Sequence, residues 1–457
     1  MFDRWKPAKV SSATRFATVS AGTNRTCALS LTSEAWCWGQ GVYGSNGDGT
    51  LGYRTIPALV TAQVDQSPIV IRSIRIANVR DTSFTVSWVT DVATTGAVRW
   101  GADDGTTPAT VVADTRGATA TFTVHYVTVN GAKASTRYRL DVVSGTVTDT
   151  NAGAHYLVTT GPTLALTGSD QARGTIARAD GIAPDGVVVH VRATGTTGNS
   201  APLAFLMTAA NAKEWAANLG NLRTATLDAT YPVTDTTQVI VTADGGADGT
   251  VGATTTVATA RTGSLSLSLG TPVATPLQGG WTLVALRVTP SPALAASGVC
   301  SLTNLDAPGS VVEVVRWSAG AWESHLCNLP PNDFTLEPGA GYFVRTTGAA
   351  TWPTWGTAIT TPVTRALIAG WNLIGAAATS PTPSTAPGTC TTLNGAVAGS
   401  ALEVVQWVDA GWAAHTCGTT VNQFTMQVGQ GYFVKMAKSG SLATSGSAPV
   451  SASTARR

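Results

Sequence analysis

The residues best suited to acid–base or metal chemistry are few and scattered. The five histidines are spread over four predicted domains: His125, His155, His190, His325 and His415. A zinc or two-metal site needs several ligands that converge on one place. Glu313 and Glu403 occupy matching positions, but two carboxylates that hydrolyse a glycosidic bond must flank one cleft, and these lie in separate modules. The sequence therefore predicts a protein that is not an enzyme and holds no metal or cofactor.

The six cysteines fall into three local pairs. The expected disulfides are Cys27–Cys37, Cys300–Cys327 and Cys390–Cys417. No pair has the Cys-x2-Cys spacing of a zinc site, so disulfides are the main interpretation and buried free thiols are the alternative. Closing a loop as long as those of the last two pairs would stabilise the fold by about 3 to 4 kcal/mol in the chain-entropy model. Three disulfides would imply an oxidising compartment.

The last two cysteine pairs belong to two copies of one segment. Adding 90 to a residue number maps the first copy onto the second, from Gly280-Trp281 and Gly370-Trp371 at the start to Gly341-Tyr342-Phe343 and Gly431-Tyr432-Phe433 near the end. Such a tandem duplication indicates a repeated structural unit. Each copy reads as a Gly-Trp strand, a hairpin with a Gly-containing turn, and a closing strand that pairs near the first.

The duplicated tryptophans are the best candidates for binding. Trp317 with Trp322, and Trp407 with Trp412, flank the expected hairpin turns. Exposed indole rings could stack on sugar faces or on another subunit, whereas the alternative interpretation places them in the core of a small sandwich.

We expect four further residues of the repeats to have structural roles. His325 and His415 precede the second cysteine of each pair by two residues, and we expect them to be partly buried strand residues. Trp352 and Trp355 have no counterparts in the second copy, and we expect them to staple the two repeats together.

Two segments before the repeats resemble known families. The strand-like runs at 16–22 and 26–29, followed by Trp36-Cys37-Trp38-Gly39, resemble one repeat of the regulator of chromosome condensation family of β-propellers. Runs at 84–89, 97–101 and 122–127, with Tyr138 placed as in a tyrosine corner, resemble a fibronectin type III domain. The latter is similar to the domain that precedes the metal site of purple acid phosphatases, whose Asp, Asn and His ligand set does not follow here. The Gly-Trp modules resemble repeats near the ends of bacterial surface and secreted proteins.

Composition bounds the class of protein. Charged residues make up 12% of the chain and the net charge is +2, which gives no reason to expect nucleic acid as a partner. There is no run of eighteen apolar residues, so we expect no membrane insertion. Residues 1–7 do not read as a signal peptide, and we expect the natural N-terminus to lie upstream.

These observations predict an all-β chain, a string of sandwich-like modules after one propeller-type repeat. The predicted segments are 1–66, a single and incomplete propeller-type repeat; 67–164, fibronectin type III-like; 165–268, an immunoglobulin- or transthyretin-like sandwich; 269–358 and 359–447, Gly-Trp repeats 1 and 2; and 448–457, a flexible tail.

The first functional hypothesis is a noncatalytic extracellular or cell-surface protein with a structural or adhesive role. Its partners would be other copies of itself, surface proteins or glycans, and the chain would assemble into a filament or surface layer if the propeller-type segment docks on another copy. The alternative hypothesis is the accessory, carbohydrate- or surface-binding region of a secreted hydrolase whose catalytic domain lies upstream.

Overall fold

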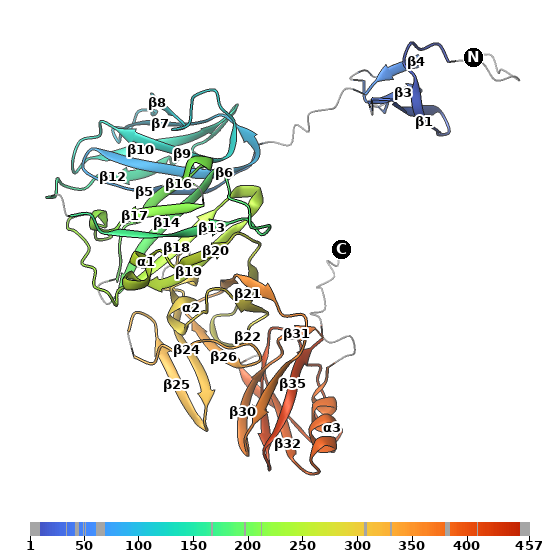
Figure 1. Cartoon of the computed structure of the whole chain (residues 1–457), viewed down its shortest axis with the longest axis vertical. Coiled ribbons are helices and arrows are strands. Elements are labelled where there is room, and N and C mark those ends of the chain that lie inside the picture. Colours follow the sequence, from blue (N-terminus) through green and yellow to red (C-terminus); the bar gives the residue numbers. More distant parts are fainter. Residues whose placement is uncertain are drawn as a thin grey trace, which may run out of the picture. The chain divides into compact units, whose positions relative to one another are not determined.

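The structure of the chain is a computed structural model. It describes residues 10–32, 34–41, 45–48, 50, 52–60, 69–165, 168–195, 198–211, 213–305, 309–329, 331–379, 384–408 and 410–447. The tail predicted at 448–457 lies outside these residues. The chain divides into two compact units, Met1–Ile69 (unit 1) and Val70–Arg457 (unit 2) (Figure 1). Each sheet within them is built from strands of a single one of the sequence segments given above.

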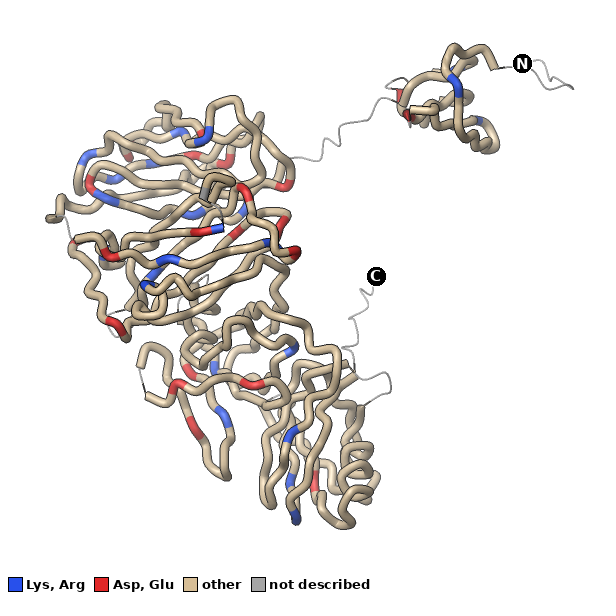
Figure 2. The backbone as a smooth tube through the Cα atoms, viewed as in Figure 1, with Lys and Arg blue, Asp and Glu red and all other residues tan. Residues whose placement is uncertain are grey.

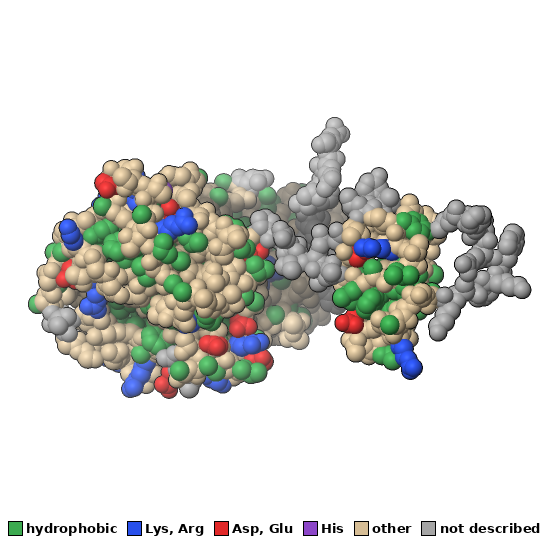
Figure 3. All heavy atoms as spheres, turned by 90° about the horizontal axis from the view of Figure 1, so that it is seen from above, with side chains coloured by type: hydrophobic (Ala, Val, Ile, Leu, Met, Phe, Trp, Pro, Cys, Tyr) green, Lys and Arg blue, Asp and Glu red, His purple; other side chains and the backbone are tan. Residues whose placement is uncertain are grey.

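Unit 1 is one antiparallel sheet with the up-and-down order β1-β2-β3-β4. Its strands are β1 (Phe16–Ala21), β2 (Arg25–Ser30), β3 (Ala35–Gly39) and β4 (Arg54–Leu59). Cys27 lies opposite Cys37 and the two are disulfide-bonded. Phe16 stacks on Trp38 with ring centroids 5.8 Å apart. The described residues of unit 1 form this one sheet and no closed propeller, so apolar side chains remain on its surface (Figure 3). Val19 and Ile56 are among them.

Unit 2 begins with a two-layer sandwich. One layer contains β5 (Ile71–Ala77), β6 (Ser83–Thr94) and β9 (Phe122–Asn130); the other contains β7 (Gly96–Ala102), β8 (Thr110–Ala113), β10 (Arg137–Ser144), β11 (Val147–Asp149) and β12 (Tyr156–Thr159). Phe84, Trp88 and Leu140 are buried between the layers. The Tyr138 hydroxyl accepts a hydrogen bond from the Lys133 amide at 2.7 Å, which is the predicted tyrosine corner. This strand arrangement confirms the fibronectin type III-like fold.

The next module is a second sandwich. One layer has β13 (Gln171–Ala177), β17 (Glu214–Asn218) and β20 (Leu265–Ser268); the other has β14 (Val187–Gly195), β15 (Gly198–Asn199), β16 (Leu203–Met207), β18 (Gln238–Asp244) and β19 (Thr250–Thr256), with α1 (Val257–Thr262) and the 3-10 turns η2 (Ala209–Asn211), η3 (Leu219–Asn221) and η4 (Gly246–Asp248) between strands. Trp215 lies on β17 and is fully buried in the core.

Sheet β5-β6-β9 of the first sandwich packs on the sheet that contains β14. Val89, Val124 and Val188 form a small shared core, and the Asn78 side-chain amide donates to the Ala204 carbonyl at 2.9 Å. The centre of β6 is therefore buried on both faces, because one face covers its own sandwich and the other covers the neighbour.

The two repeats share one design. Repeat 1 contains β21 (Val273–Leu277), β22 (Gly280–Ala285), β23 (Val288–Pro290), α2 (Ala296–Thr303), β24 (Val311–Ser318), β25 (Ala321–Leu326), β26 (Gly341–Thr346), β27 (Ala350–Thr354) and β28 (Gly356–Ala358). Repeat 2 contains β29 (Val363–Leu367), β30 (Gly370–Gly375), β31 (Ala378–Thr379), α3 (Ala386–Ala396), β32 (Ala401–Val408), β33 (Gly411–Thr416), β34 (Gly431–Met436) and β35 (Gly440–Gly446). Their main sheets have the matching orders β22-β26-β24-β25 and β30-β34-β32-β33.

Each repeat also carries a helix that the all-β prediction did not include. Cys300 lies in α2 and is bonded to Cys327, which follows β25; Cys390 in α3 is bonded to Cys417 in the same way. The disulfide thus ties the helix to the edge of the sheet. The helix covers one face of the sheet, where Val314 and Val344, or Val404 and Val434, are buried. The other face remains for a different partner.

Candidate functional site: an aromatic groove between the repeats

The free faces of the two main sheets pack against each other. Their shared core joins three residues of repeat 1 to the matching three of repeat 2: Leu283, Val315, Phe343, Leu373, Val405 and Phe433. Backbone contacts are exchanged reciprocally, since the Ala285 amide donates to the Gly429 carbonyl and the Gly375 amide donates to the Gly339 carbonyl, both at 2.8 Å. The repeats are therefore related like the two halves of a twofold-symmetric dimer.

The tryptophans are placed by the two hairpins. Trp317 lies opposite Trp322 across a turn in which Ala319 and Gly320 have φ of 50° and 85°, as a two-residue type I′ turn requires. Their ring centroids are 4.9 Å apart at 73°. Trp407 and Trp412 repeat the arrangement at 4.7 Å and 70°.

The inner tryptophans connect the repeats. The Trp317 indole N–H donates to the Trp371 carbonyl at 2.8 Å, and the Trp407 indole N–H donates to the Trp281 carbonyl at 3.1 Å. Each ring also meets the phenylalanine of the other repeat edge-on, with Phe343 and Trp407 centroids 5.7 Å apart. These contacts assign Trp317 and Trp407 to the shared core, where they are partly buried.

The outer tryptophans face solvent. Trp322 is 51% exposed, Trp412 is 53% exposed and Trp281 is 37% exposed. They border a groove with a volume of about 390 Å³, within the range of small-molecule sites. The groove is lined by Trp281, Glu313, Val315, Trp322, Ser324, Phe343, Trp407 and Trp412. Neither sequence interpretation of the four tryptophans holds for all of them, because one pair belongs to the core and the other pair to the surface.

Two polar side chains, Glu313 and Ser324, line the groove, and Arg345 lies beside them. The Ser324 hydroxyl donates to Glu313 Oε1 at 2.5 Å, and Arg345 Nη2 lies 2.8 Å from Glu313 Oε2. Arg345 also lies over the Trp281 ring, 5.5 Å from its centroid. The register explains this grouping: Glu313 pairs with Arg345, Arg345 pairs with Trp281, and Ser324 pairs with Val315, so all these side chains point to the same face.

This arrangement suits binding better than catalysis. Aromatic rings with one hydrogen-bonded carboxylate can hold the apolar face of a ligand and orient its polar edge. The Glu313 carboxylate is already engaged by Arg345 and Ser324, and it has no second carboxylate in the groove lining to act with. The sequence did not single out Trp281, Phe343 and Ser324; the signal available for them was their place on alternate positions of strands that carry the tryptophans.

The expected role of two further tryptophans is wrong in its detail. Trp352 is fully buried in the core of repeat 1, and Trp355 packs against both that core and the core of the preceding sandwich. The Trp355 indole N–H donates to the Thr250 hydroxyl at 3.3 Å. Trp355 therefore joins repeat 1 to the module before it instead of joining the two repeats. The repeats meet through a separate set of side chains, the shared core around Phe343 and Phe433.

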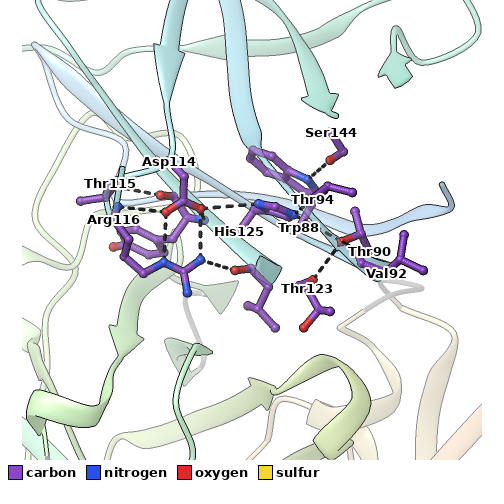
Figure 4. A network of polar contacts seen from close by, with 12 residues as sticks. Trp88, Thr90, Val92, Thr94, Asp114, Thr115, Arg116, Thr123, His125 and Ser144 are labelled. Carbon is purple, nitrogen blue, oxygen red and sulfur yellow. Dashed lines mark hydrogen bonds and ion pairs between the residues drawn. The ribbon is translucent and has the colours of Figure 1, made fainter. Parts of the chain in front are cut away.

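His125 lies in a polar network between hydroxyl groups on one side and Asp114 on the other, the same sequence of groups as in a catalytic triad (Figure 4). Thr90 and Thr94 hydroxyls lie 3.3 Å from His125 Nε2, and Asp114 Oδ2 lies 3.6 Å from Nδ1. Burial would raise the pKa of Asp114, but the nearby His125 ring and hydrogen bonds from Arg116 and from the Arg116 and Tyr126 backbone amides together hold it well below its usual value.

Geometry excludes this network as an active site. His125 is fully buried and stacks on Trp88 with centroids 4.8 Å apart, and Asp114 is also buried. The Thr90 hydroxyl donates to the Val92 carbonyl at 2.8 Å, so its proton is not held by the histidine. No substrate could reach these groups, and the network serves to fix the sandwich core.

The remaining four histidines contact other groups of the fold. His325 and His415 are buried strand residues whose Nδ1 atoms contact the Pro331 and Val421 carbonyls at 3.2 and 2.9 Å. His190 is buried between the two sandwiches, where its Nε2 lies 3.1 Å from the Ser87 hydroxyl, and burial lowers its pKa to about 3. His155 Nδ1 is 2.7 Å from Asp141.

A second cavity, of about 490 Å³, lies between the second sandwich and repeat 1. His325 and Asp333 both line it, but the Asp333 carboxylate binds the Ser297 amide and hydroxyl at 2.9 and 2.6 Å and does not orient the histidine. The cavity therefore lacks the base-and-orienter geometry of nucleophilic catalysis.

Among the described residues, no group of three or more His, Cys, Asp or Glu side chains is arranged to hold a metal ion. None of the helices in the described part of the chain has both the length and the apolar character to span a membrane. Lys and Arg residues lie interspersed with Asp and Glu residues along unit 2 (Figure 2).

No protein-family model matches the chain, and no similar protein is found among the curated proteins. Among solved structures, the chain is similar to the FN1–FN3 domains of chicken CNTN1, with 10% sequence identity, 63% of this chain and 98% of that chain covered, and a TM-score of 0.16. The fold assignment rests on the strand order and the tyrosine corner of this chain.

Proposed function

We propose that the protein is a noncatalytic, modular protein of the extracellular space or cell surface, with a structural or adhesive role. The observation that carries the proposal is the pairing of the cysteines: all six are in disulfides, and each disulfide lies within one module. Disulfides of this kind persist in oxidising compartments and stabilise small modules that have modest cores.

The contacts between modules of unit 2 support a scaffold role. The two sandwiches share the contact between Asn78 and Ala204, and the second sandwich meets repeat 1 where the Gln238 side-chain amide donates to the Ser297 hydroxyl at 2.8 Å. The two repeats share the core around Phe343 and Phe433. Buried contacts at successive junctions hold neighbouring modules in fixed positions, which suits a protein that presents surfaces instead of closing on a substrate.

The test is where the protein is found and in which redox state. Cells that make the chain are washed, and the surface, medium and cytosolic fractions are probed with antibody after alkylation of free thiols. We expect the protein in the surface or medium fraction with its cysteines unlabelled. Recovery from the cytosol with labelled cysteines would overturn the proposal.

Unit 1 supports a self-assembling form of this function. Its described residues leave apolar side chains exposed, including Val19 in β1, Ile56 in β4 and Leu31 after β2, at 61%, 54% and 68%. A lone sheet with exposed apolar side chains is suited to pack against another chain, and a contact between unlike surfaces extends into a filament. Electron microscopy at high protein concentration should show polymers, and monomers alone would remove this form of the proposal.

The second candidate function is the accessory region of a secreted hydrolase. The aromatic groove favours it, because a surface-binding module would hold an attached catalytic domain near its substrate. The reading frame upstream of Met1 decides between the two: a catalytic domain encoded there supports the accessory role, and a further row of binding modules supports the adhesive one.

A further inference from the structure

We propose that the groove between the repeats binds a neutral, extended oligosaccharide whose pyranose rings carry equatorial hydroxyls. The inference deepens the proposed adhesive function and rests on it, because it assigns the class of surface ligand. A pyranose with equatorial hydroxyls has flat faces of C–H groups and a polar edge, and a groove that combines aromatic rings with a few polar groups is complementary to both.

The aromatic part of the argument is the exposure of three indole rings. Large apolar side chains are rarely left half exposed in a cluster without a partner. Trp281, Trp322 and Trp412 are 37%, 51% and 53% exposed and border the same groove. Trp317 and Trp407 pack against the shared core, and Trp407 also contributes to the groove lining. Phe343 stands nearly perpendicular to Trp412, at 82°, so the rings form walls as well as a floor.

The polar part of the argument is charge balance. Aromatic walls with a free carboxylate would suit a quaternary ammonium ligand. Here Arg345 lies 2.8 Å from Glu313 and neutralises it, so the groove offers no unbalanced negative charge. Arg345 lies beside the groove lining, where its side chain is 43% exposed and retains further N–H donors, and the Ser324 oxygen in the lining can accept. Together they can exchange hydrogen bonds with hydroxyl groups of a ligand. A neutral hydroxylated ligand fits this site better than a cation.

The duplication supplies a matched control. Trp371 occupies in repeat 2 the position that Trp281 occupies in repeat 1, and it has the same type of cation contact, with Lys435 Nζ 5.2 Å from its ring centroid. Trp371 does not line the groove. In addition, Ala414 stands where repeat 1 has Ser324, so the fold accepts alanine at this position. Trp371→Ala is therefore the control for loss of a tryptophan outside the groove. Ser324→Ala is the mildest test of a groove residue.

The experiment measures binding of cellohexaose and of N-acetylchitohexaose to the full chain by isothermal titration calorimetry and tryptophan fluorescence, with tetramethylammonium as the cationic probe. We expect saturable binding of at least one oligosaccharide. Trp281→Ala, Trp322→Ala and Trp412→Ala should each weaken it by about tenfold, which is the usual cost of losing one stacked ring. Trp371→Ala should leave it within about twofold, and Ser324→Ala should weaken it by about threefold through one lost hydrogen bond.

Several results would overturn the assignment. These are no saturable response to either oligosaccharide, binding of tetramethylammonium in preference to them, or equal losses in Trp281→Ala and Trp371→Ala. If a tryptophan variant does not fold, as judged by circular dichroism, Ser324→Ala decides, and unchanged affinity would contradict the assignment. Failure here with all cysteines still paired would leave the proposed extracellular scaffold in place, whereas free thiols would remove that scaffold whatever the groove binds.

Discussion

The two repeats have the same architecture but differ at the edge of their shared interface. Both contain a sheet of the same strand order, a helix, and a disulfide with a sequence separation of 27. At the edge, Ser324 corresponds to Ala414 and Arg345 corresponds to Lys435, whose Nζ lies 3.5 Å from Glu403. The core positions that meet across the interface are identical in the two copies, whereas these two edge positions differ.

The core positions are identical because each core side chain must fit its own repeat and the other repeat at the same time. In a twofold arrangement a residue of one copy packs against a different residue of the other copy, so a change at Phe343 disturbs contacts with Trp407 and Trp412 as well as with its own sheet. Side chains at the open edge contact solvent on one side and tolerate change. The comparison therefore separates a symmetric structural core from an asymmetric surface, and the surface is where a binding site can differ between the copies.

The largest expected effect on stability comes from truncating the two matching phenylalanines of the shared core. Phe343→Ala and Phe433→Ala should each lower the free energy of unfolding by about 3 to 5 kcal/mol, because each ring is buried and in contact with several others. Denaturant unfolding of the full chain measures the loss. The two values should agree within about 1 kcal/mol if the repeats are equivalent, and a small loss for only one of them would break the comparison.

Each of the two repeat disulfides should contribute almost as much to the free energy of unfolding, and the two contributions should be equal. Replacing Cys300 and Cys327 together by alanine, or Cys390 and Cys417 together, should cost about 3 to 4 kcal/mol in each case, because both disulfides close loops of the same length. Thermal unfolding of the two double variants tests this. A large loss for one pair and none for the other would show that the helix-to-sheet connection matters in one copy only.

Matching tyrosines should give the repeats a matching sensitivity to high pH. Burial raises the pKa of Tyr342 and of Tyr432 to about 12, and their hydroxyls accept from the Glu337 and Gln427 amides at 2.6 Å. Each tyrosine's contribution is fully present below its unfolded pKa of about 10 and is lost as pH rises towards 12, by about 1.4 kcal/mol per pH unit.

Urea unfolding at pH 9, 10 and 11 measures this sensitivity. Tyr342→Phe and Tyr432→Phe should each make the fall in stability above pH 10 shallower by a similar amount. The same slope in the wild type and in both variants would contradict the buried, neutral state of the two phenols.

The smallest effect is expected at the interface edge. Arg345→Lys should change the free energy of unfolding by less than about 1 kcal/mol, because the Arg345 side chain is 43% exposed and exposed ion pairs contribute little. Lys435→Arg should be similarly mild. A loss as large as that of Phe343→Ala would show that the edge belongs to the core and would remove the distinction drawn above.

The sequence was informative about elements and weak about how they meet. The 90-residue offset, the hairpins that bear Trp317 and Trp407, and the tyrosine corner at Tyr138 were predictable because each depends on local spacing. The helices around Cys300 and Cys390 were missed, since their segments are rich in small residues and lack a clear helical pattern of apolar positions.

The groove was not predictable in the same way. Alternation along a strand shows that two faces exist, but it does not show which face meets another sheet. The distinction between Trp317, which is packed inside, and Trp322, which is half exposed, depends on the angle at which the two repeats dock. The Thr90, Asp114 and His125 network had no sequence signal either, because its members come from different parts of the first sandwich.

The most direct measurement is peptide mapping of the purified, unreduced protein after alkylation under denaturing conditions. The account predicts that none of the six cysteines is alkylated and that crosslinked peptides join Cys27 to Cys37, Cys300 to Cys327 and Cys390 to Cys417. Six alkylated cysteines, or a crosslink between a cysteine of one repeat and a cysteine of the other, would contradict it.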